Sequence, residues 1–289
     1  MRKKLLATLM AAVMLATAGC SGMPGMGNTQ TTAAADSQDG GDSASGTDDT
    51  VYDLKIHTSQ TEQALITRNY QKLADAVNEK SGGRLNLQVF PAGQLGADED
   101  VIEQAIQGVN VAVNTDAARL GQYVSDFSIF MMAYFVDDYD EGYAVTQTET
   151  FKNWEKELEE KHGVKVLSFT FYDGPRHFMT NKEIHAPEDL KGLRIRTIGQ
   201  EVCTESLSAM GATPISMSWG EVYNGIQSKA IDGCEAQNTS TFPSKIYEVC
   251  NTQSKTGHFQ LMQALICGKS WFDTLPADLQ TMLVETAQE

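Results

Sequence analysis

The sequence predicts an α/β fold with two lobes, and three observations support this prediction. Apolar strands alternate with amphipathic helices from residue 52 onward, which favours a parallel sheet with helices on its faces. The stretch 51–289 is long enough for two lobes of ordinary domain size. A second series of short strands follows the first, after a strand at 164–171 that we expect to cross between the lobes.

The first lobe begins with a regular succession of strands and helices. Its predicted strands are 52–57, 85–90 and 109–114, and its predicted helices are 62–80, 98–108 and 140–162. Residues 52–57 alternate apolar and polar side chains, as a half-buried strand does, and Gly82 and Gly83 stop the first helix.

The second lobe contains the second series of strands. These are predicted at 177–180, 193–196, 213–215 and 231–235, with helices between them. Residues 279–289 read as a helix without a stop signal, so we expect that the C-terminal helix is truncated. We therefore assign 51–173 plus 262–289 to the first lobe and 174–261 to the second.

The N-terminus predicts export. Residues 1–19 have a basic start and an apolar run too short for a membrane span, as a signal peptide does. Small residues then precede Cys20, a pattern typical of lipoprotein processing, so we expect Cys20 to be lipidated. The alternative is ordinary cleavage near Ala18. Residues 20–50 have almost nothing to bury and predict a flexible linker. We thus expect an exported protein, lipid-anchored to the outer face of the cytoplasmic membrane or periplasmic.

The charge of the chain limits its partners. It carries 38 acidic and 22 basic residues, a formal net charge of −16. Such a surface repels nucleic acid, so we exclude nucleic-acid partners. It also repels small anions at long range, so an anion site must work through local arginines and helix ends.

Nothing in the sequence indicates catalysis or a metal site. The histidines have no metal-ligand spacing, and GxSxG, P-loop and GxGxxG motifs are absent. We predict no catalytic residue, no metal and no cofactor. Four cysteines, Cys203, Cys234, Cys250 and Cys267, show no CxxC spacing, and the sequence leaves open whether they are paired or buried as thiols.

Arg196 is the leading candidate for ligand binding. It closes an apolar strand just before a helix, and the carboxyl ends of strands in an α/β sheet open onto the crevice where ligands bind. A guanidinium group there is suited to hold a carboxylate. The alternative is a solvated surface arginine. The expected role is capture of a small organic anion.

Three further residues should border the cleft. Arg176 opens the second lobe just after the predicted crossing strand, and Arg119 follows the third strand of the first lobe. The alternative for Arg119 is a salt bridge with Asp116, which can itself form part of the pocket wall. Trp219, at a helix start, either packs in the core or covers the apolar part of the ligand.

The body of the chain resembles the extracytoplasmic solute-binding subunit of tripartite ATP-independent periplasmic (TRAP) transporters, of the DctP type. The resemblance covers nearly all of 52–289. It rests on the order and spacing of matching stretches at 90–96 (FPAGQLG), 189–196 (DLKGLRIR), 211–214 (GATP), 221–223 (EVY), 231–233 (IDG), Lys245 and 247–249 (YEV).

The resemblance implies a type II-like periplasmic binding protein with a hinge and a central ligand cleft. It implies that Arg196 clamps a carboxylate and that Arg176 is a second cleft arginine. Members that bind sialic acid have cleft residues at the positions of Asp98, Asp116, Arg119 and Trp219. Ala236 stands where those members have asparagine, and Ser59 replaces another asparagine, which favours a smaller carboxylate.

The expected function is capture of a small organic acid (a carboxylate, C4-dicarboxylate-like acid or sugar acid) for the membrane permease of a TRAP transporter. Two alternatives remain open at this point. The same fold can present a ligand to a membrane receptor as a sensory module, or the chain can be a secreted enzyme. An enzyme consumes its ligand, whereas a binding protein returns it intact.

Overall fold

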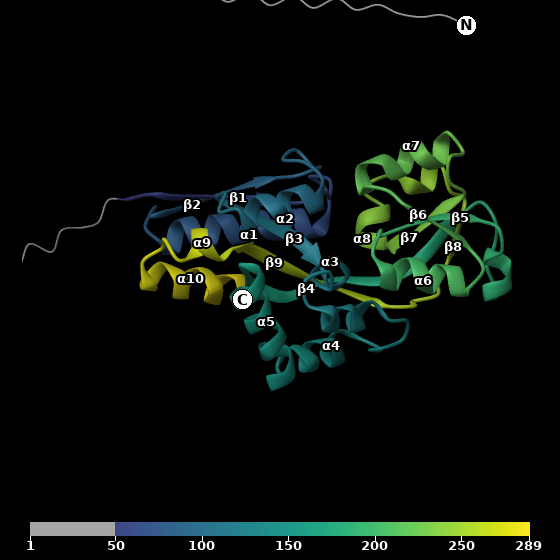
Figure 1. Cartoon of the computed structure of the whole chain (residues 1–289). Coiled ribbons are helices and arrows are strands. Elements are labelled where there is room, and N and C mark those ends of the chain that lie inside the picture. Colours follow the sequence, from purple (N-terminus) through teal and green to yellow (C-terminus); the bar gives the residue numbers. More distant parts are fainter. Residues whose placement is uncertain (1–49) are drawn as a thin grey trace, which may run out of the picture. The chain divides into compact units, whose positions relative to one another are not determined.

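Three parallel strands form the start of the first lobe. The computed structural model describes residues 50–289, so the predicted signal peptide, Cys20 and the linker up to residue 49 lie outside the described residues. The strands are β1 (Tyr52–His57), β2 (Leu85–Phe90) and β3 (Val111–Asp116), in the order β2-β1-β3. Their carboxyl ends point toward the second lobe (Figure 1).

Helices cover both faces of this sheet. The helices of the first lobe are α1 (Leu65–Lys80), α2 (Asp98–Ile106), α3 (Ala117–Leu120), α4 (Tyr139–Thr146), α5 (Glu149–His162), α9 (Lys269–Phe272) and α10 (Ala277–Gln288). In β3, Val111 and Val113 belong to the core beneath α2 and α5, while Ala112 belongs to the core beneath α1 and α10. The period-two alternation of a strand therefore divides the apolar side chains between two cores.

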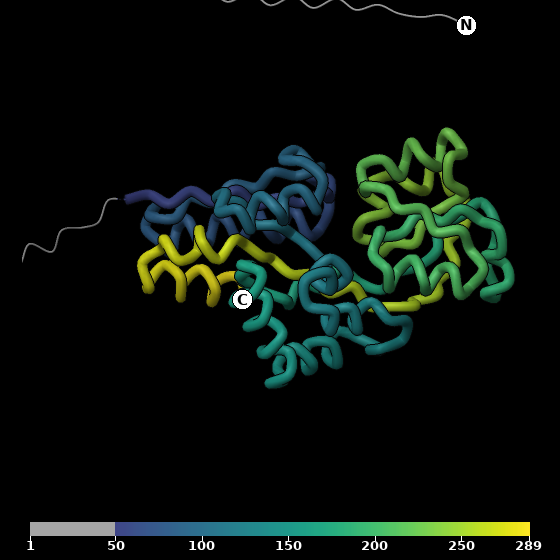
Figure 2. The backbone as a smooth tube through the Cα atoms, viewed as in Figure 1, coloured from purple at the N-terminus to yellow at the C-terminus, as the bar shows by residue number. Residues whose placement is uncertain are grey.

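Two long strands connect the lobes. Strand β4 (Val164–Thr180) is antiparallel to β9 (Gln260–Gly268) over its first part and to β7 (Gly233–Gln237) over its last residues. The pairing of β4 with β9 is irregular between Val166 and Gly174. Figure 2 shows both segments passing from one lobe to the other. The hinge of the fold is thus a two-stranded connection.

The second lobe is a smaller sheet with its own helices. Its other strands are β5 (Arg194–Thr197), β6 (Thr213–Ser216) and β8 (Thr252–Ser254), and its helices are α6 (Glu201–Ala209), α7 (Val222–Gln227) and α8 (Asn238–Thr241). Strand β5 lies parallel to both β6 and β7. The strand order β2-β1-β3-β9-β4-β7-β5-β6 runs through both lobes. The predicted two-lobed α/β fold is confirmed.

The structure corrects three local predictions. The single helix expected at 140–162 is two helices, because Thr148 caps α5 by accepting a hydrogen bond from the backbone N–H of Phe151. The strands expected at 164–171 and 177–180 are one continuous strand, β4. Strand β9 has no counterpart in the sequence prediction, because it is buried on both faces and lacks the polar alternation that marks a half-exposed strand.

The four cysteines of the folded part are buried free thiols: Cys203, Cys234, Cys250 and Cys267. Burial raises the pKa of the Cys250 thiol to about 11, so this group is protonated and unreactive at neutral pH. Of the helices within 50–289, none has the length and apolar character needed to cross a bilayer.

Candidate functional site

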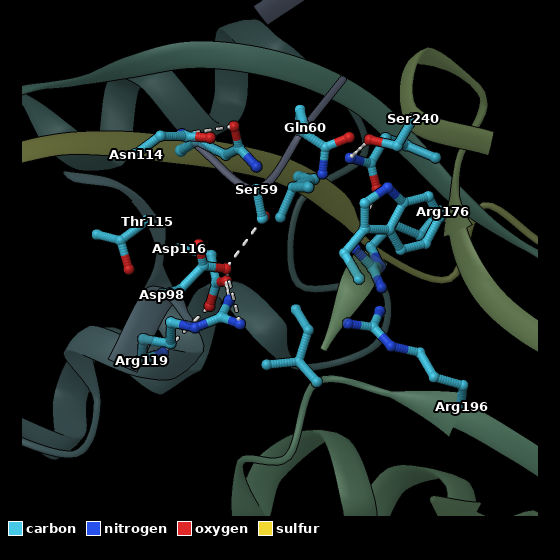
Figure 3. A pocket seen from close by; sticks show the side chains of 15 residues that line it. Ser59, Gln60, Asp98, Asn114, Thr115, Asp116, Arg119, Arg176, Arg196 and Ser240 are labelled. Atoms are coloured by element: carbon cyan, nitrogen blue, oxygen red, sulfur yellow. Dashed lines mark hydrogen bonds and ion pairs between the residues drawn. The ribbon is translucent and has the colours of Figure 1, made fainter. Parts of the chain in front are cut away.

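A polar cavity lies where the carboxyl ends of strands from both lobes meet. The space between its walls, counted together with the open solvent at its mouth, is about 440 Å³. It is lined by Ser59, Gln60, Asp98, Asn114, Thr115, Asp116, Arg119, Arg176, Arg196, Ile198, Trp219, Gln237, Ser240, Leu261 and Gln263. Figure 3 shows Arg119 with Asp98 and Asp116 on one side and Arg196 on the opposite side. This is the crevice in which α/β folds bind ligands.

The predicted site residues come together in this cavity, with one exception. Arg196, Arg176, Arg119, Asp116, Asp98 and Trp219 all line it. Ala236 does not: it is buried in the core of the second lobe. Its neighbour Gln237 lines the cavity instead, because successive side chains of β7 point to opposite faces. The structure thus brings Gln237, and not Ala236, to the cavity, and a ligand contact of Ala236 stays a prediction.

Arg196 is a buried cation without an acidic partner. Its side chain leaves the end of β5, and the residue is 3% exposed. Its Nε donates to the backbone oxygen of Met217 at 2.9 Å, and its guanidinium lies 5.3 Å from the ring centroid of Trp219. Within 50–289, no carboxylate forms an ion pair with it, and its terminal nitrogens make no hydrogen bond to a described residue. Burial and the nearby charge of Arg176 lower the pKa of Arg196 to about 10.

Arg176, in contrast, is paired with a carboxylate of the protein. Its Nε and Nη2 donate to the two carboxylate oxygens of Glu235, at 2.6 and 2.7 Å, and Nη1 donates to Gln237 at 3.0 Å. His258 lies 3.5 Å from Glu235, and Thr197 donates to it at 2.6 Å. Burial opposes the charge of Glu235, but Arg176 and His258 outweigh burial and hold the pKa of Glu235 well below its usual range. This pair is therefore ionised and mutually neutralising.

Arg119 sits in an excess of acid on the first-lobe side. It forms ion pairs with Asp98 (3.1 Å), Glu99 (2.8 Å) and Asp116. Burial opposes its charge, yet these acids outweigh burial and raise the pKa of Arg119. Asp116 also caps α3 by accepting from the backbone N–H of Arg119 at 3.1 Å. The Asp116 salt bridge and a place in the pocket wall, which the sequence offered as alternatives, are both present.

Asp98 is held at the cavity wall by groups from two other segments. His57 Nε2 lies 2.9 Å from Asp98 Oδ1, and Ser59 Oγ donates to Oδ2 at 3.2 Å. Burial raises the pKa of a carboxyl group, but the hydrogen bond from His57 and the charge of Arg119 outweigh it and hold the pKa of Asp98 below its ordinary value. Asp98 is thus a carboxylate at neutral pH, with oxygens that accept hydrogen bonds.

Several lining residues were not predicted from the sequence. Gln60 follows β1, Asn114 lies in β3, and Gln237 ends β7, so each lies near the carboxyl end of a strand. A rule that takes every polar residue at such a strand end would have found them. Gln263 carries no such signal, because it lies within β9, which the sequence did not reveal.

This arrangement is suited to binding. Polar walls, an uncompensated arginine and two lobes on a two-stranded connection define a two-lobed binding protein. Within the described residues, no three His, Cys, Asp or Glu side chains gather as a metal site.

The chain belongs to the DctP family, described as bacterial extracellular solute-binding protein, family 7, whose match spans residues 56–289. It is 30% identical over 219 residues to the C4-dicarboxylate-binding periplasmic protein DctP of Vibrio cholerae; the matched part is 75% of this chain and 65% of that protein. The chain thus spans less than two thirds of that relative's length.

Two solved structures share the fold. A TRAP periplasmic solute-binding protein from Escherichia fergusonii, in an apo open state, is 34% identical with a TM-score of 0.70, covering 81% of this chain and 79% of that one. One from Actinobacillus succinogenes with bound L-galactonate is 27% identical with a TM-score of 0.79, covering 81% and 78%. The fold is therefore that of type II periplasmic binding proteins, and the family resemblance seen in the sequence is confirmed.

Proposed function

We propose that this protein binds a small organic acid outside the cytoplasm and delivers it to the membrane permease of a TRAP transporter, without catalysing a reaction. The observation that carries this proposal is Arg196, a buried guanidinium that faces the cavity and has no carboxylate partner among the described residues. A buried charge is costly unless it is paired, so the missing partner is expected to come from a ligand. The relatives named above bind a C4-dicarboxylate and L-galactonate, which are organic acids.

The two lobes are proposed to close around the ligand. We place them at 51–173 plus 262–289 and at 174–261, so the boundaries fall within β4 and β9. The described backbone matches the L-galactonate-bound relative with a higher TM-score than the open relative, although its identity to the open relative is higher. This supports a closed arrangement, in which the ligand contacts both lobes.

The proposed location is the outer face of the cytoplasmic membrane. Lipidation of Cys20 would anchor the folded body there through the linker 21–50. Mass spectrometry of the mature N-terminus tests this part. We expect a diacylated or triacylated Cys20 and a membrane fraction that Cys20→Ser loses. An unmodified N-terminus near residue 18 would contradict the anchor.

Calorimetry on variants of β5 tests the binding site. Arg196→Ala should weaken binding of a carboxylate ligand by about 100-fold or more, because a charged hydrogen-bonded pair is lost in an enclosed site. Arg196→Lys should recover only part of the loss, since an ammonium group is not a planar fork. Arg194→Ala is the matched control: Arg194 lies on the same strand but pairs with Asp232 away from the cavity. If Arg196→Ala folds normally and binds the ligand with the affinity of the wild type, the ligand does not bind at Arg196.

A further inference from the structure

The cavity is electrostatically divided between its two walls. On the second-lobe wall, Arg196 carries a positive charge that no described carboxylate neutralises, and Trp219 lies against its guanidinium. On the first-lobe wall, Asp98 and Asp116 share Arg119, which Glu99 also contacts. One wall thus has an unmatched cation and the other an excess of carboxylate oxygens (Figure 3).

We propose that the ligand is a polyhydroxylated monocarboxylic acid of the aldonate or uronate type, with its carboxylate on Arg196 and its hydroxyl groups donating to the first-lobe wall. This inference rests on the proposed function and narrows it to one class of organic acid. It assigns different chemical roles to the two walls: the second lobe binds the carboxylate of the ligand, and the first lobe accepts hydrogen bonds from its hydroxyl groups.

The first-lobe wall has unused capacity to accept hydrogen bonds. A carboxylate has about four acceptor positions. Asp98 accepts from His57, Ser59 and Arg119, and Asp116 accepts from the backbone and side chain of Arg119, so both have acceptor positions left. Buried acceptors that lack a donor are costly, and ligand hydroxyl groups are donors that fit them.

Two orphaned polar atoms in the wall point to the same chemistry. Gln60 Oε1 and Thr115 Oγ1 are buried and have no hydrogen-bond partner in the described part of the chain. Both residues line the cavity. An amide oxygen can only accept, so Gln60 requires a donor such as a hydroxyl group. The walls offer little apolar surface besides Ile198, Leu261 and Trp219, which disfavours a ligand made of methylene groups.

A second carboxylate on the ligand finds no free cation. Arg119 already has three acidic partners. Arg176 is held by both oxygens of Glu235, by its backbone oxygen and by Gln237, which leaves one N–H of its guanidinium. A second anion placed toward the first lobe would meet Asp98 and Asp116, which are like charges. The cavity therefore discriminates against C4-dicarboxylates.

Binding to a matched set of small molecules tests this inference on the wild-type protein. Calorimetry is run with L-galactonate, D-gluconate, D-galacturonate and D-erythronate, and with three controls. Hexanoate has no hydroxyl groups, galactitol has no carboxylate, and succinate has a second carboxylate in place of hydroxyl groups. The best hydroxy acid should bind about 100-fold or more tightly than any control, because a site built to hydrogen-bond hydroxyl groups rejects analogues that lack them.

Variants of two acids at the start of α2 then test whether the first-lobe wall causes the preference for a hydroxy acid. Asp98→Asn should weaken the best hydroxy acid by about tenfold or more and reduce its advantage over succinate, because one acceptor and one repelling charge are lost. Asp100→Asn is the matched control: Asp100 lies in the same first turn of α2 but is exposed and does not line the cavity, so both ligands should change by less than about twofold. Circular dichroism verifies folding of both variants.

The outcomes separate this inference from the proposed function. Succinate binding as tightly as the best hydroxy acid would overturn the inference and leave organic-acid capture intact. An equal loss for succinate and the hydroxy acid in Asp98→Asn would also overturn it. If no carboxylate in the set bound at millimolar concentration, both the inference and the proposed function would fail.

Discussion

Arg176 and Arg196 lie in the same sheet of the second lobe, and both are almost completely buried. Arg176 sits in β4 and is matched by Glu235 on β7, so its charge is neutralised within the protein. Arg196 sits on β5, two strands away from β4, and its neighbours are a backbone oxygen and an aromatic ring. The two side chains therefore differ in partner rather than in burial.

This difference separates a charge that the fold itself neutralises from one that is free to pair with the proposed ligand. A buried ion pair contributes little net stability, but removal of one member leaves the other uncompensated. An unpaired buried arginine has the reverse property: it neutralises no charge within the fold and can pair with a ligand. Proteins retain such locally unfavourable groups at functional sites.

The largest expected effect is on stability, in Arg176→Met. Glu235 would stay buried without its cation, so the free energy of unfolding should fall by about 3–5 kcal/mol. Denaturant titration at pH 7 measures it. Arg176→Met combined with Glu235→Gln should recover most of the loss, because neither charge remains. A loss below about 1 kcal/mol in the single variant would mean that the buried charge of Glu235 does not depend on Arg176 for compensation.

The second effect is ligand-dependent stabilisation through Arg196. At a ligand concentration of about 100 times the dissociation constant, the wild type should gain about 2.7 kcal/mol. Arg196→Ala should gain almost nothing at that concentration, and Arg194→Ala should gain as much as the wild type. Thermal unfolding with and without ligand provides the measurement. An equal ligand-induced gain of stability in all three proteins would show that Arg196 contributes no more to ligand binding than Arg194 does.

The third effect is on the acid sensitivity of the Arg176 pair. The pKa of Glu235 is held below its usual range in the folded protein, so below about pH 4.3 the unfolded chain binds a proton that the folded protein does not. The stability from this group is complete above that pH and is lost as the pH falls toward the lowered pKa. The wild type should lose up to about 1.4 kcal/mol per pH unit more than the double variant lacking both charges. Equal losses of unfolding free energy in the wild type and the double variant between pH 5 and 3 would contradict an ionised pair of Arg176 and Glu235.

The smallest effect is a gain of stability from Arg196→Met in the ligand-free protein. Methionine has a similar length and no charge to desolvate, so the free energy of unfolding should rise by about 1 kcal/mol. The contacts with Met217 and Trp219 are lost in this variant and limit the gain. A clear decrease, measured by denaturant titration without ligand, would show that Arg196 supports the fold after all.

Much of the candidate site was predictable, because its residues follow local patterns. Arg196 was found as a strand-end arginine before a helix, and Arg119 as the residue that follows the third strand. Gln60 and Gln237 were missed although they obey the same rule. Ala236 was predicted at the cleft, whereas the structure turns residue 236 to the core and Gln237 to the cavity. A one-residue difference along a strand changes the face.

The sequence by itself determined the α/β class, the strands β1 and β2, the family resemblance and the arginines at the cleft. These follow from hydrophobic periodicity and short motifs, which are local properties of the chain. Only the tertiary structure decided that β9 is a strand between the lobes, because burial on both faces erases its periodicity.

The tertiary structure alone also decided which arginine is free. Glu235 lies 59 residues from Arg176 in the chain and reaches it through the antiparallel register of β4 and β7. Asp98 lies far from His57 in sequence and meets it where a helix start packs against the end of β1. Electrostatic pairing acts over a few ångströms, and sheet register sets which residues come that close. Arg196 remains without a described carboxylate because it pairs in register with Cys234, so that Glu235, the next residue of β7, points to the opposite face and meets Arg176.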